Sequence, residues 1–207
     1  MTSKQIGRRG ALTGLLVSAF GLGMGTAFTS RASQNRTSHG SSSTLVAYLS
    51  RSGNTRMIAE SLARQLNADL CAIRTVEPYP EDYEAHVLRA HQQQETGELP
   101  VLAGQLTGFD RYRSVFLAFP VWGQNLPAPV RSFLAQYDME TRILFPCVTH
   151  GGYGPGRSLE ILAQLAPNAE IRPAFIKQCD SERETLGLLQ DWTGLVMKPE
   201  GIHSPDL

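Results

Sequence analysis

The sequence has few of the residues that mark metalloproteins or disulfide-stabilised proteins. It has three cysteines, Cys71, Cys147 and Cys179, and none of them forms a C-x-x-C pair. Cys71 and Cys147 lie in apolar runs, where buried thiols are expected. The odd count gives no disulfide framework, although a single bridge stays open. The histidines are scattered, and His86 and His91 are five residues apart, which does not place them on one helix face. No metal site is therefore expected.

Three motifs of common enzyme classes are also absent. The Walker pattern G-x-x-x-x-G-K-[ST] does not occur, which argues against a nucleoside triphosphate with magnesium. The pattern G-x-G-x-x-G does not occur either, so a dinucleotide pyrophosphate loop is not indicated. The stretch His150–Gly152, "HGG", is similar to an oxyanion loop of esterases. However, G-x-S-x-G occurs nowhere in the chain, which argues against a hydrolase.

Acidic residues are missing from the first 59 positions, whereas basic residues are present there. Residues 1–32 join a basic start to an uncharged apolar run and to small residues that fit a cleavage site, so we interpret them as an export signal. Arg8-Arg9, followed by Leu12, resembles a twin-arginine signal, with Ala11 in place of the usual bulky apolar residue. The run is marginally long and weakly apolar for a membrane span. The alternative is an uncleaved membrane anchor.

The predicted mature chain is mildly acidic. Residues 1–32 contain four basic residues and no acidic one, so removing them leaves fifteen basic against nineteen acidic residues, a formal charge of −4. This balance argues against nucleic acid as a partner and fits a protein that meets a basic partner surface. A periplasmic or other extracytoplasmic location is expected, with no stable membrane span after cleavage.

The rest of the chain has the pattern of one α/β domain. Residues 33–43 are polar and are interpreted as a flexible linker, the domain is expected over residues 44–198, and a tail follows at 199–207. Short apolar runs alternate with helical patterns, and the polar span Pro80–Thr96 is expected to be an exposed helix. The expected strands are Thr44–Leu49, Leu70–Arg74, Ser114–Phe119, Ile143–Thr149 and Glu170–Ile176. This alternation predicts a doubly wound, five-stranded parallel sheet. Ligands bind such sheets at the carboxyl ends of the strands.

The loop after the first expected strand, "SRSGNT", collects small polar side chains at the start of a helix. A helix start has unpaired backbone N–H groups and a positive dipole end, which suit a phosphate. Ser50, Ser52, Asn54 and Thr55 can donate hydrogen bonds, and Gly53 lets the backbone approach a ligand closely. The alternative is an ordinary capped turn, because the same residue types favour N-caps.

The loops after the third and fourth expected strands contain aromatic residues and glycines. Trp122 directly follows a strand and precedes Gly123, so it is a candidate wall for a flat ring. The stretch Thr149–Ser158 has several glycines, which permit close approach of a ligand, and Tyr153 offers a second aromatic face. The alternatives are a tryptophan folded under its own loop and a mobile glycine loop. Together the three loops predict a planar heterocycle that carries a phosphate.

These three stretches, in this order and spacing, resemble the flavodoxins over almost all of residues 44–177, in the family's short form. "SRSGNT" is similar to the family's S/T-x-S/T-G-N-T phosphate loop. The resemblance implies the strand order 2-1-3-4-5 with FMN at the switch point. It implies no catalytic residue, and it implies FMN contacts from Ser50, Ser52, Gly53, Asn54 and Thr55 at the phosphate, from Pro120, Val121, Trp122, Gly123 and Asn125 on one side of the ring, and from Thr149, His150, Gly151, Gly152, Tyr153 and Gly156 on the other.

Two features depart from the family pattern. Arg51 lies within the phosphate loop, where neutral donors are usual, and could pair with the phosphate or point to solvent. The mature chain is also less acidic than carrier flavodoxins, which leaves the docking partners open. The leading interpretation is an electron carrier that shuttles electrons between redox proteins through FMN. The alternatives are an FMN-dependent NAD(P)H:quinone or flavin-type reductase, with His150 as a candidate proton donor, and a flavin-free interaction module.

Overall fold

A computed structural model describes residues 42–178 and 182–198, all within one compact unit of the chain. The predicted export signal, most of the predicted linker, Cys179 and the tail at 199–207 lie outside the described residues. The bounds of the folded domain therefore rest on the sequence.

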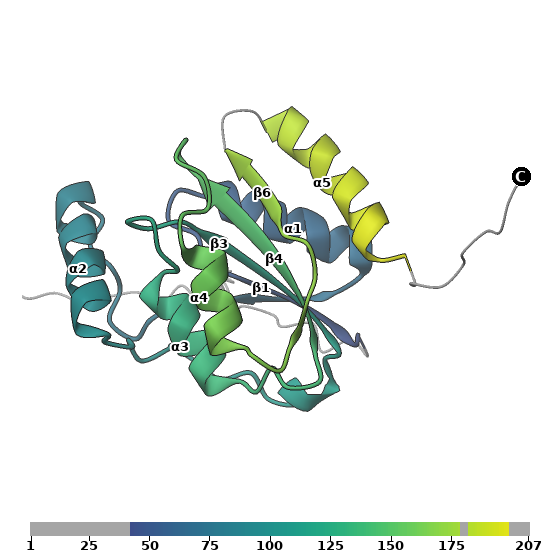
Figure 1. Cartoon of the computed structure of the whole chain (residues 1–207), viewed down its shortest axis with the longest axis horizontal. Coiled ribbons are helices and arrows are strands. Elements are labelled where there is room, and N and C mark those ends of the chain that lie inside the picture. Colours follow the sequence, from purple (N-terminus) through teal and green to yellow (C-terminus); the bar gives the residue numbers. More distant parts are fainter. Residues whose placement is uncertain (1–41, 179–181, 199–207) are drawn as a thin grey trace, which may run out of the picture. The chain divides into compact units, whose positions relative to one another are not determined.

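The domain is built on a parallel sheet. Its strands are β1 (Thr44–Tyr48), β2 (Asp69–Ala72), β3 (Ser114–Pro120), β4 (Ile143–His150), β5 (Glu170–Ile171) and β6 (Phe175–Gln178). The order is β2-β1-β3-β4-β5, and β6 also pairs with β4 (Figure 1). The predicted flavodoxin-like sheet is thereby confirmed, with its switch point between β1 and β3.

The last expected strand, Glu170–Ile176, is divided in the structure. β5 pairs with the start of β4, and β6 pairs with its end from Cys147 to His150. Pro173 lies in the gap between the two segments. Proline has no N–H to donate to a neighbouring strand, and an edge position tolerates that loss. The division thus leaves β4 paired at both of its ends.

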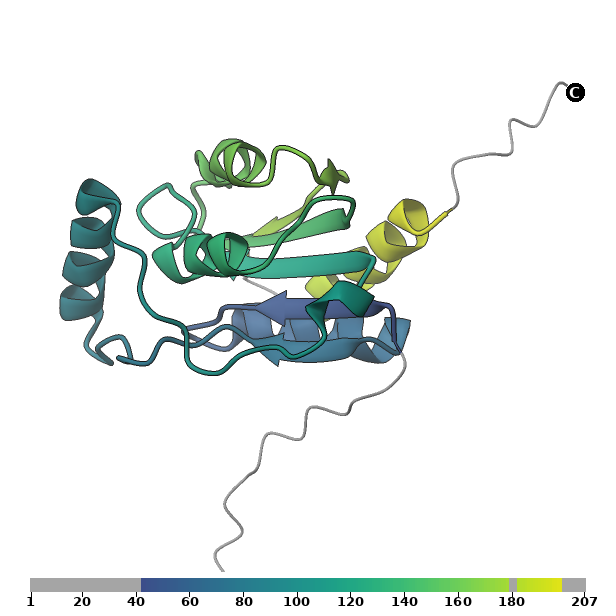
Figure 2. The same cartoon turned by 90° about the horizontal axis from the view of Figure 1, so that it is seen from below.

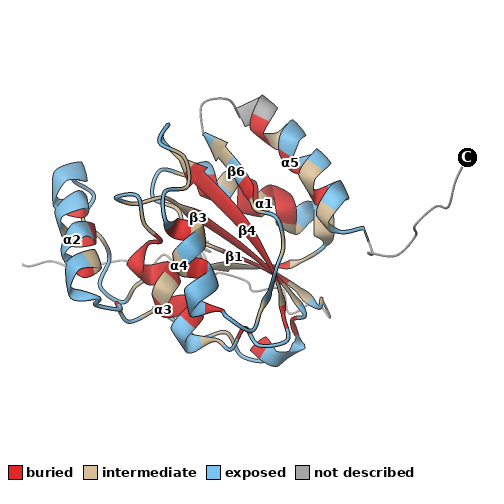
Figure 3. Cartoon of the chain, viewed as in Figure 1, coloured by how far each residue is buried: buried red, intermediate tan, exposed pale blue. Residues whose placement is uncertain are grey.

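Four helices cover the two faces of the sheet. Helices α1 (Asn54–Leu66) and α5 (Glu182–Val196) lie on one face, and α3 (Ala128–Gln136) and α4 (Ser158–Leu165) lie on the other, as the two views in Figures 1 and 2 show. Neighbouring strand residues face opposite sides, so Val46 packs with α1 and α5 while Leu45 packs with α3 and α4. The central strands are buried on both faces, as Figure 3 shows.

Helix α2 (Tyr83–Thr96) stands beside the carboxyl edge of the sheet rather than over a face (Figures 1 and 2). It begins at Asp82, whose side chain accepts a hydrogen bond from the backbone of Ala85 at 2.8 Å. Most of the helix is exposed, as its polar sequence predicts. Phe109, in the short helix η1 (Phe109–Arg111), and Tyr112 belong to the core cluster on the α3 side of the sheet. Because these two residues belong to the core on that face, α2 is not needed there, and it forms a wall at the carboxyl edge, where the ligand loops lie.

Candidate functional site

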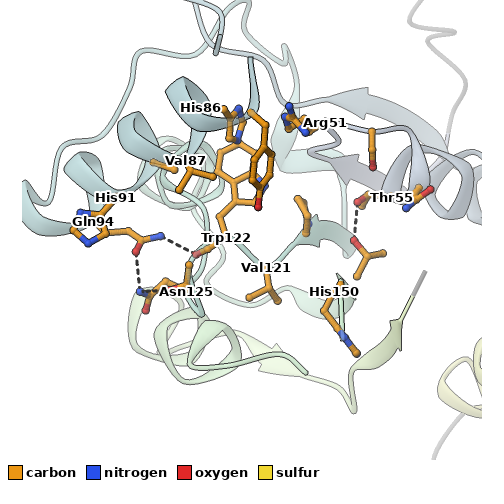
Figure 4. Close-up of a pocket in the computed structure, with 18 residues that line it drawn as sticks. Arg51, Thr55, His86, Val87, His91, Gln94, Val121, Trp122, Asn125 and His150 are labelled. Carbon is orange, nitrogen blue, oxygen red and sulfur yellow. Dashed lines mark hydrogen bonds between the residues drawn. The ribbon is translucent and has the colours of Figure 1, made fainter. Parts of the chain in front are cut away.

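The loops after β1, β3 and β4 meet at the carboxyl edge of the sheet and, with α2, enclose a cavity of about 590 Å³ (Figure 4). The cavity brings together most of the residues predicted from the three loops: Ser52, Asn54, Thr55, Pro120, Val121, Trp122, Gly123, Asn125, Thr149, His150 and Gly151. Five predicted residues do not line it: Ser50, Gly53, Gly152, Tyr153 and Gly156. The volume lies within the range of about 300–1,000 Å³ that small-molecule sites occupy.

The first loop presents the start of α1 to the cavity. Gly53 caps the helix with φ of 101°, a backbone conformation that favours glycine, and its N–H donates to Ser50 Oγ at 3.1 Å. No acidic side chain occupies the first turn, so the positive end of the helix is not neutralised there. The hydroxyls of Thr55 and Thr149 lie 2.9 Å apart and are buried, which joins this loop to the end of β4.

Arg51 connects the first loop to the segment before α2. Its Nη2 donates to the carbonyl oxygen of Glu81 at 3.0 Å, and its guanidinium lies over the ring of Tyr83, 5.2 Å from the ring centroid. Arg51 is exposed and also lines the cavity, so pairing of its guanidinium with a phosphate stays a prediction.

The second loop is a tight turn held against α2. Trp122 and Asn125 exchange backbone hydrogen bonds across Gly123 and Gln124, which both have positive φ, as a type I′ turn requires. Gln94 of α2 donates to the carbonyl oxygen of Trp122 at 2.7 Å and accepts from the Asn125 side chain at 3.0 Å (Figure 4). These bonds fix the turn relative to α2.

The third loop is organised by His150 and anchored to the second. Nδ1 of His150 accepts from the backbone N–H groups of Gly152 and Gly154, at 3.1 and 3.3 Å. When the ring is neutral, this arrangement places its proton on Nε2. The N–H of Arg157 donates to the carbonyl oxygen of Gln124 at 2.8 Å. A Cβ on Gly156 would lie 2.3 Å from that same oxygen, so only glycine fits where the two loops touch.

The aromatic residues of the two loops are arranged differently from one another. Trp122 packs against α2, with its ring edge-to-face to His86 at 4.4 Å and to Tyr79 at 5.0 Å between ring centroids. Tyr153 is 86% exposed and lies outside the cavity lining. A stacking role for either ring stays a prediction, and the present position of Trp122 serves the α2 contact.

His86 is the most unusual residue of the site. It is 4% exposed, and neither ring nitrogen has a hydrogen-bond partner within the part of the chain that the structure describes. Burial lowers its pKa, with Arg51 and Arg89 acting in the same direction and the nearby Pro80 carbonyl opposing them. His86 is thus held as a neutral imidazole whose ring borders the cavity while both of its nitrogens are buried.

Comparison with known proteins follows this geometry. The sequence profile described as Flavodoxin matches residues 43–193. The chain belongs to the flavodoxin family. A candidate flavoprotein from Bacteroides eggerthii has a similar structure, with a TM-score of 0.66 at 22% identity, covering 75% of this chain and 98% of that one. A flavoprotein from Lactobacillus acidophilus in complex with FMN has a TM-score of 0.58 at 19% identity, covering 70% and 97%. No curated protein matches this chain.

The flavodoxin loops account for only part of the cavity wall, because α2 supplies residues that sequence reasoning did not assign. These are Tyr83, His86, Val87, Ala90, His91 and Gln94. Most of them recur at helical spacing of three or four, which is a signal for one shared face. Because these residues include both apolar and polar side chains, they do not form the apolar stripe by which a buried helix face is recognised in a sequence.

In residues 42–178 and 182–198, no helix of this flavodoxin domain combines the length and the apolar character of a membrane span. In the same ranges, no three His, Cys, Asp or Glu side chains are grouped so that they could hold a metal ion. Cys147 is buried and Cys71 half-buried, and both are free thiols.

Proposed function

We propose that this chain binds FMN non-covalently and transfers electrons to and from redox protein partners. The start of α1 carries the proposal. Its first backbone N–H groups have no helical acceptor, its first turn has no acidic side chain, and it opens on a cavity of suitable size. A phosphate monoester fits that position, and the space toward the second and third loops accommodates a planar ring.

The residues divide by what each would do for FMN. Ser52, Asn54 and Thr55 would donate hydrogen bonds to the phosphate, and Val121 and Trp122 would border the ring, from which they exclude water. FMN would supply the transfer of one or two electrons, and the protein would bind, orient and shield it. The FMN complex of the Lactobacillus acidophilus flavoprotein, which has the same fold, supports this assignment.

The first experiment measures FMN directly. The purified mature protein is expected to show the absorbance bands of bound FMN, and FMN added to the apoprotein should lose fluorescence in a saturable titration. Ser52→Ala should weaken binding about tenfold or more, because a hydrogen bond to a charged group contributes about 1.5–3 kcal/mol. Ser43→Ala, which removes an exposed hydroxyl just before β1, is the control. Equal FMN affinity in the two variants would remove the phosphate-loop assignment.

A reductase is the second candidate, and the α2 wall favours it. A carrier needs only a shielded flavin, whereas this cavity extends beyond the three loops to α2. His150, which also lines the cavity, is the candidate proton donor. Steady-state oxidation of NAD(P)H with a quinone, at tens of turnovers per second, would establish this candidate. Absence of turnover in FMN-loaded protein would favour the carrier.

We also propose that the protein is exported through a twin-arginine route to the periplasm or another extracytoplasmic compartment. The basic pair Arg8-Arg9 before an uncharged run supports this proposal. Such a route moves folded proteins, so the flavin could be bound before export. Replacing both arginines by lysine should retain the protein in the cytoplasm. Unchanged export in a cell fractionation experiment would contradict the proposal.

A further inference from the structure

A second cavity of about 600 Å³ adjoins the first and shares Arg51, His86 and Trp122 with it. Its other walls come from the start of the first loop and from the segment between β2 and α2. Apolar surface is provided by the prolines Pro78, Pro80 and Pro129 and by the ring of Tyr79. None of these last four residues lines the first cavity, so the second cavity is distinct from the first although the two share three side chains.

The charges around this second cavity favour an anion. Arg51 and Arg74 line it, against a single acidic residue, Glu81. Arg51 is partly used, since it donates to a backbone oxygen and packs on a ring. The side chain of Arg74 is exposed and makes no hydrogen bond or ion pair with another described residue, although the backbone oxygen accepts from Ala103. A guanidinium with unused donors matches a carboxylate, which it can bind with two parallel hydrogen bonds.

The ring of His86 adds aromatic surface to the cavity wall. Its packing against Tyr79 and Trp122 fixes the ring, and both nitrogens are buried, so neither is offered to a ligand. The proline and tyrosine surfaces would contact the ring of a ligand.

We propose that the second cavity binds a planar aromatic acid, with its carboxylate on Arg74 and its ring against the prolines and Tyr79. This site does not require FMN. It is separated from the first cavity by Arg51, His86 and Trp122, so both ligands could be bound together.

The experiment uses calorimetric titration of the FMN-saturated mature protein with 1-hydroxy-2-naphthoate. We expect saturable binding of one molecule. The same ring without the carboxylate, 1-naphthol, and a carboxylate without the ring, acetate, should each bind at least tenfold more weakly. Arg74→Gln should weaken binding about tenfold or more and leave FMN affinity unchanged. The control, Arg64→Gln, removes an exposed cation from the last turn of α1 and should change neither.

Absence of binding, equal binding of 1-naphthol, full affinity in Arg74→Gln, or displacement of FMN by the probe would each overturn the proposal. If FMN itself does not bind, the titration without FMN still tests this cavity.

Discussion

The contact between the second and third loops can be tested by comparing two glycines of the same loop that differ in the space available to a Cβ. Gly154 and Gly156 both have positive φ, 74° and 53°. A Cβ on Gly154 would meet nothing within 4 Å, whereas one on Gly156 would lie 2.3 Å from the backbone oxygen of Gln124. Gly154→Ala therefore measures the cost of the backbone conformation alone, and Gly156→Ala adds the cost of separating the loops.

The expected magnitudes follow from that difference. Left-handed backbone costs a residue with a side chain about 1–2 kcal/mol, so Gly154→Ala should lower the free energy of unfolding by about that amount. Gly156→Ala should lower it by about 2–3 kcal/mol more, because a backbone oxygen must move and the hydrogen bond from Arg157 N to Gln124 O is strained or lost. FMN affinity should also fall in Gly156→Ala.

Urea unfolding, followed by circular dichroism without FMN, gives both values if the dependence on urea is the same in the two variants. Equal free energies of unfolding, within about 0.5 kcal/mol, would show that the two loops do not touch at Gly156. A loss in FMN affinity without a loss in stability would instead indicate that Gly156 contacts the ligand, as its resemblance to family members implies.

Three further predictions concern residues outside that contact. Tyr112→Phe removes a buried 2.7 Å hydrogen bond to Asp69, which keeps its contact with Arg111, so urea unfolding should show a loss of about 1.5 kcal/mol. The pKa of His86 is lowered in the folded protein, so below pH of about 6.5 the unfolded chain binds more protons than the folded one. The free energy of unfolding should therefore decrease as the pH is lowered through that range, and it should decrease less steeply in His86→Phe. Burial raises the pKa of Cys147 strongly and that of Cys71 to about 11. In a Cys179→Ser background, a thiol reagent at pH 8 should therefore modify Cys71 slowly and Cys147 only after unfolding. Fast labelling of both thiols in the native protein would contradict their burial.

The sheet and the three loops could be predicted from the sequence because each depends on local pattern. Apolar runs such as Ser114–Phe119 can form strands covered on both faces, and their alternation with helical periods leaves few topologies. The carboxyl ends of the first, third and fourth strands must then meet, which brings Thr55 and Thr149 together although they are 94 residues apart. The division of the last strand could be anticipated only from Pro173, whose effect depends on an edge position.

The roles of individual loop residues were harder to predict from the sequence, because they depend on contacts between loops. Gly156 was assigned to the ligand by resemblance, yet its closest neighbour is the backbone of Gln124. His150 has a position compatible with a ligand contact, and it also holds its own loop through Gly152 and Gly154. A sequence pattern indicates that a loop requires such residues at given positions. It does not show whether they contact a ligand or a neighbouring loop.

The placement of α2 lay beyond any local pattern, and Arg51 shows why. A polar helix has no apolar stripe to determine which surface it covers, so its position is set by a few specific contacts. Arg51 reaches Glu81 and Tyr83, and Gln94 joins the helix to the turn after β3. In the structure this arginine of the predicted phosphate loop therefore connects the loop to the start of α2. Because the same arginine borders both cavities, Arg51→Ala should loosen α2 and affect two binding sites together.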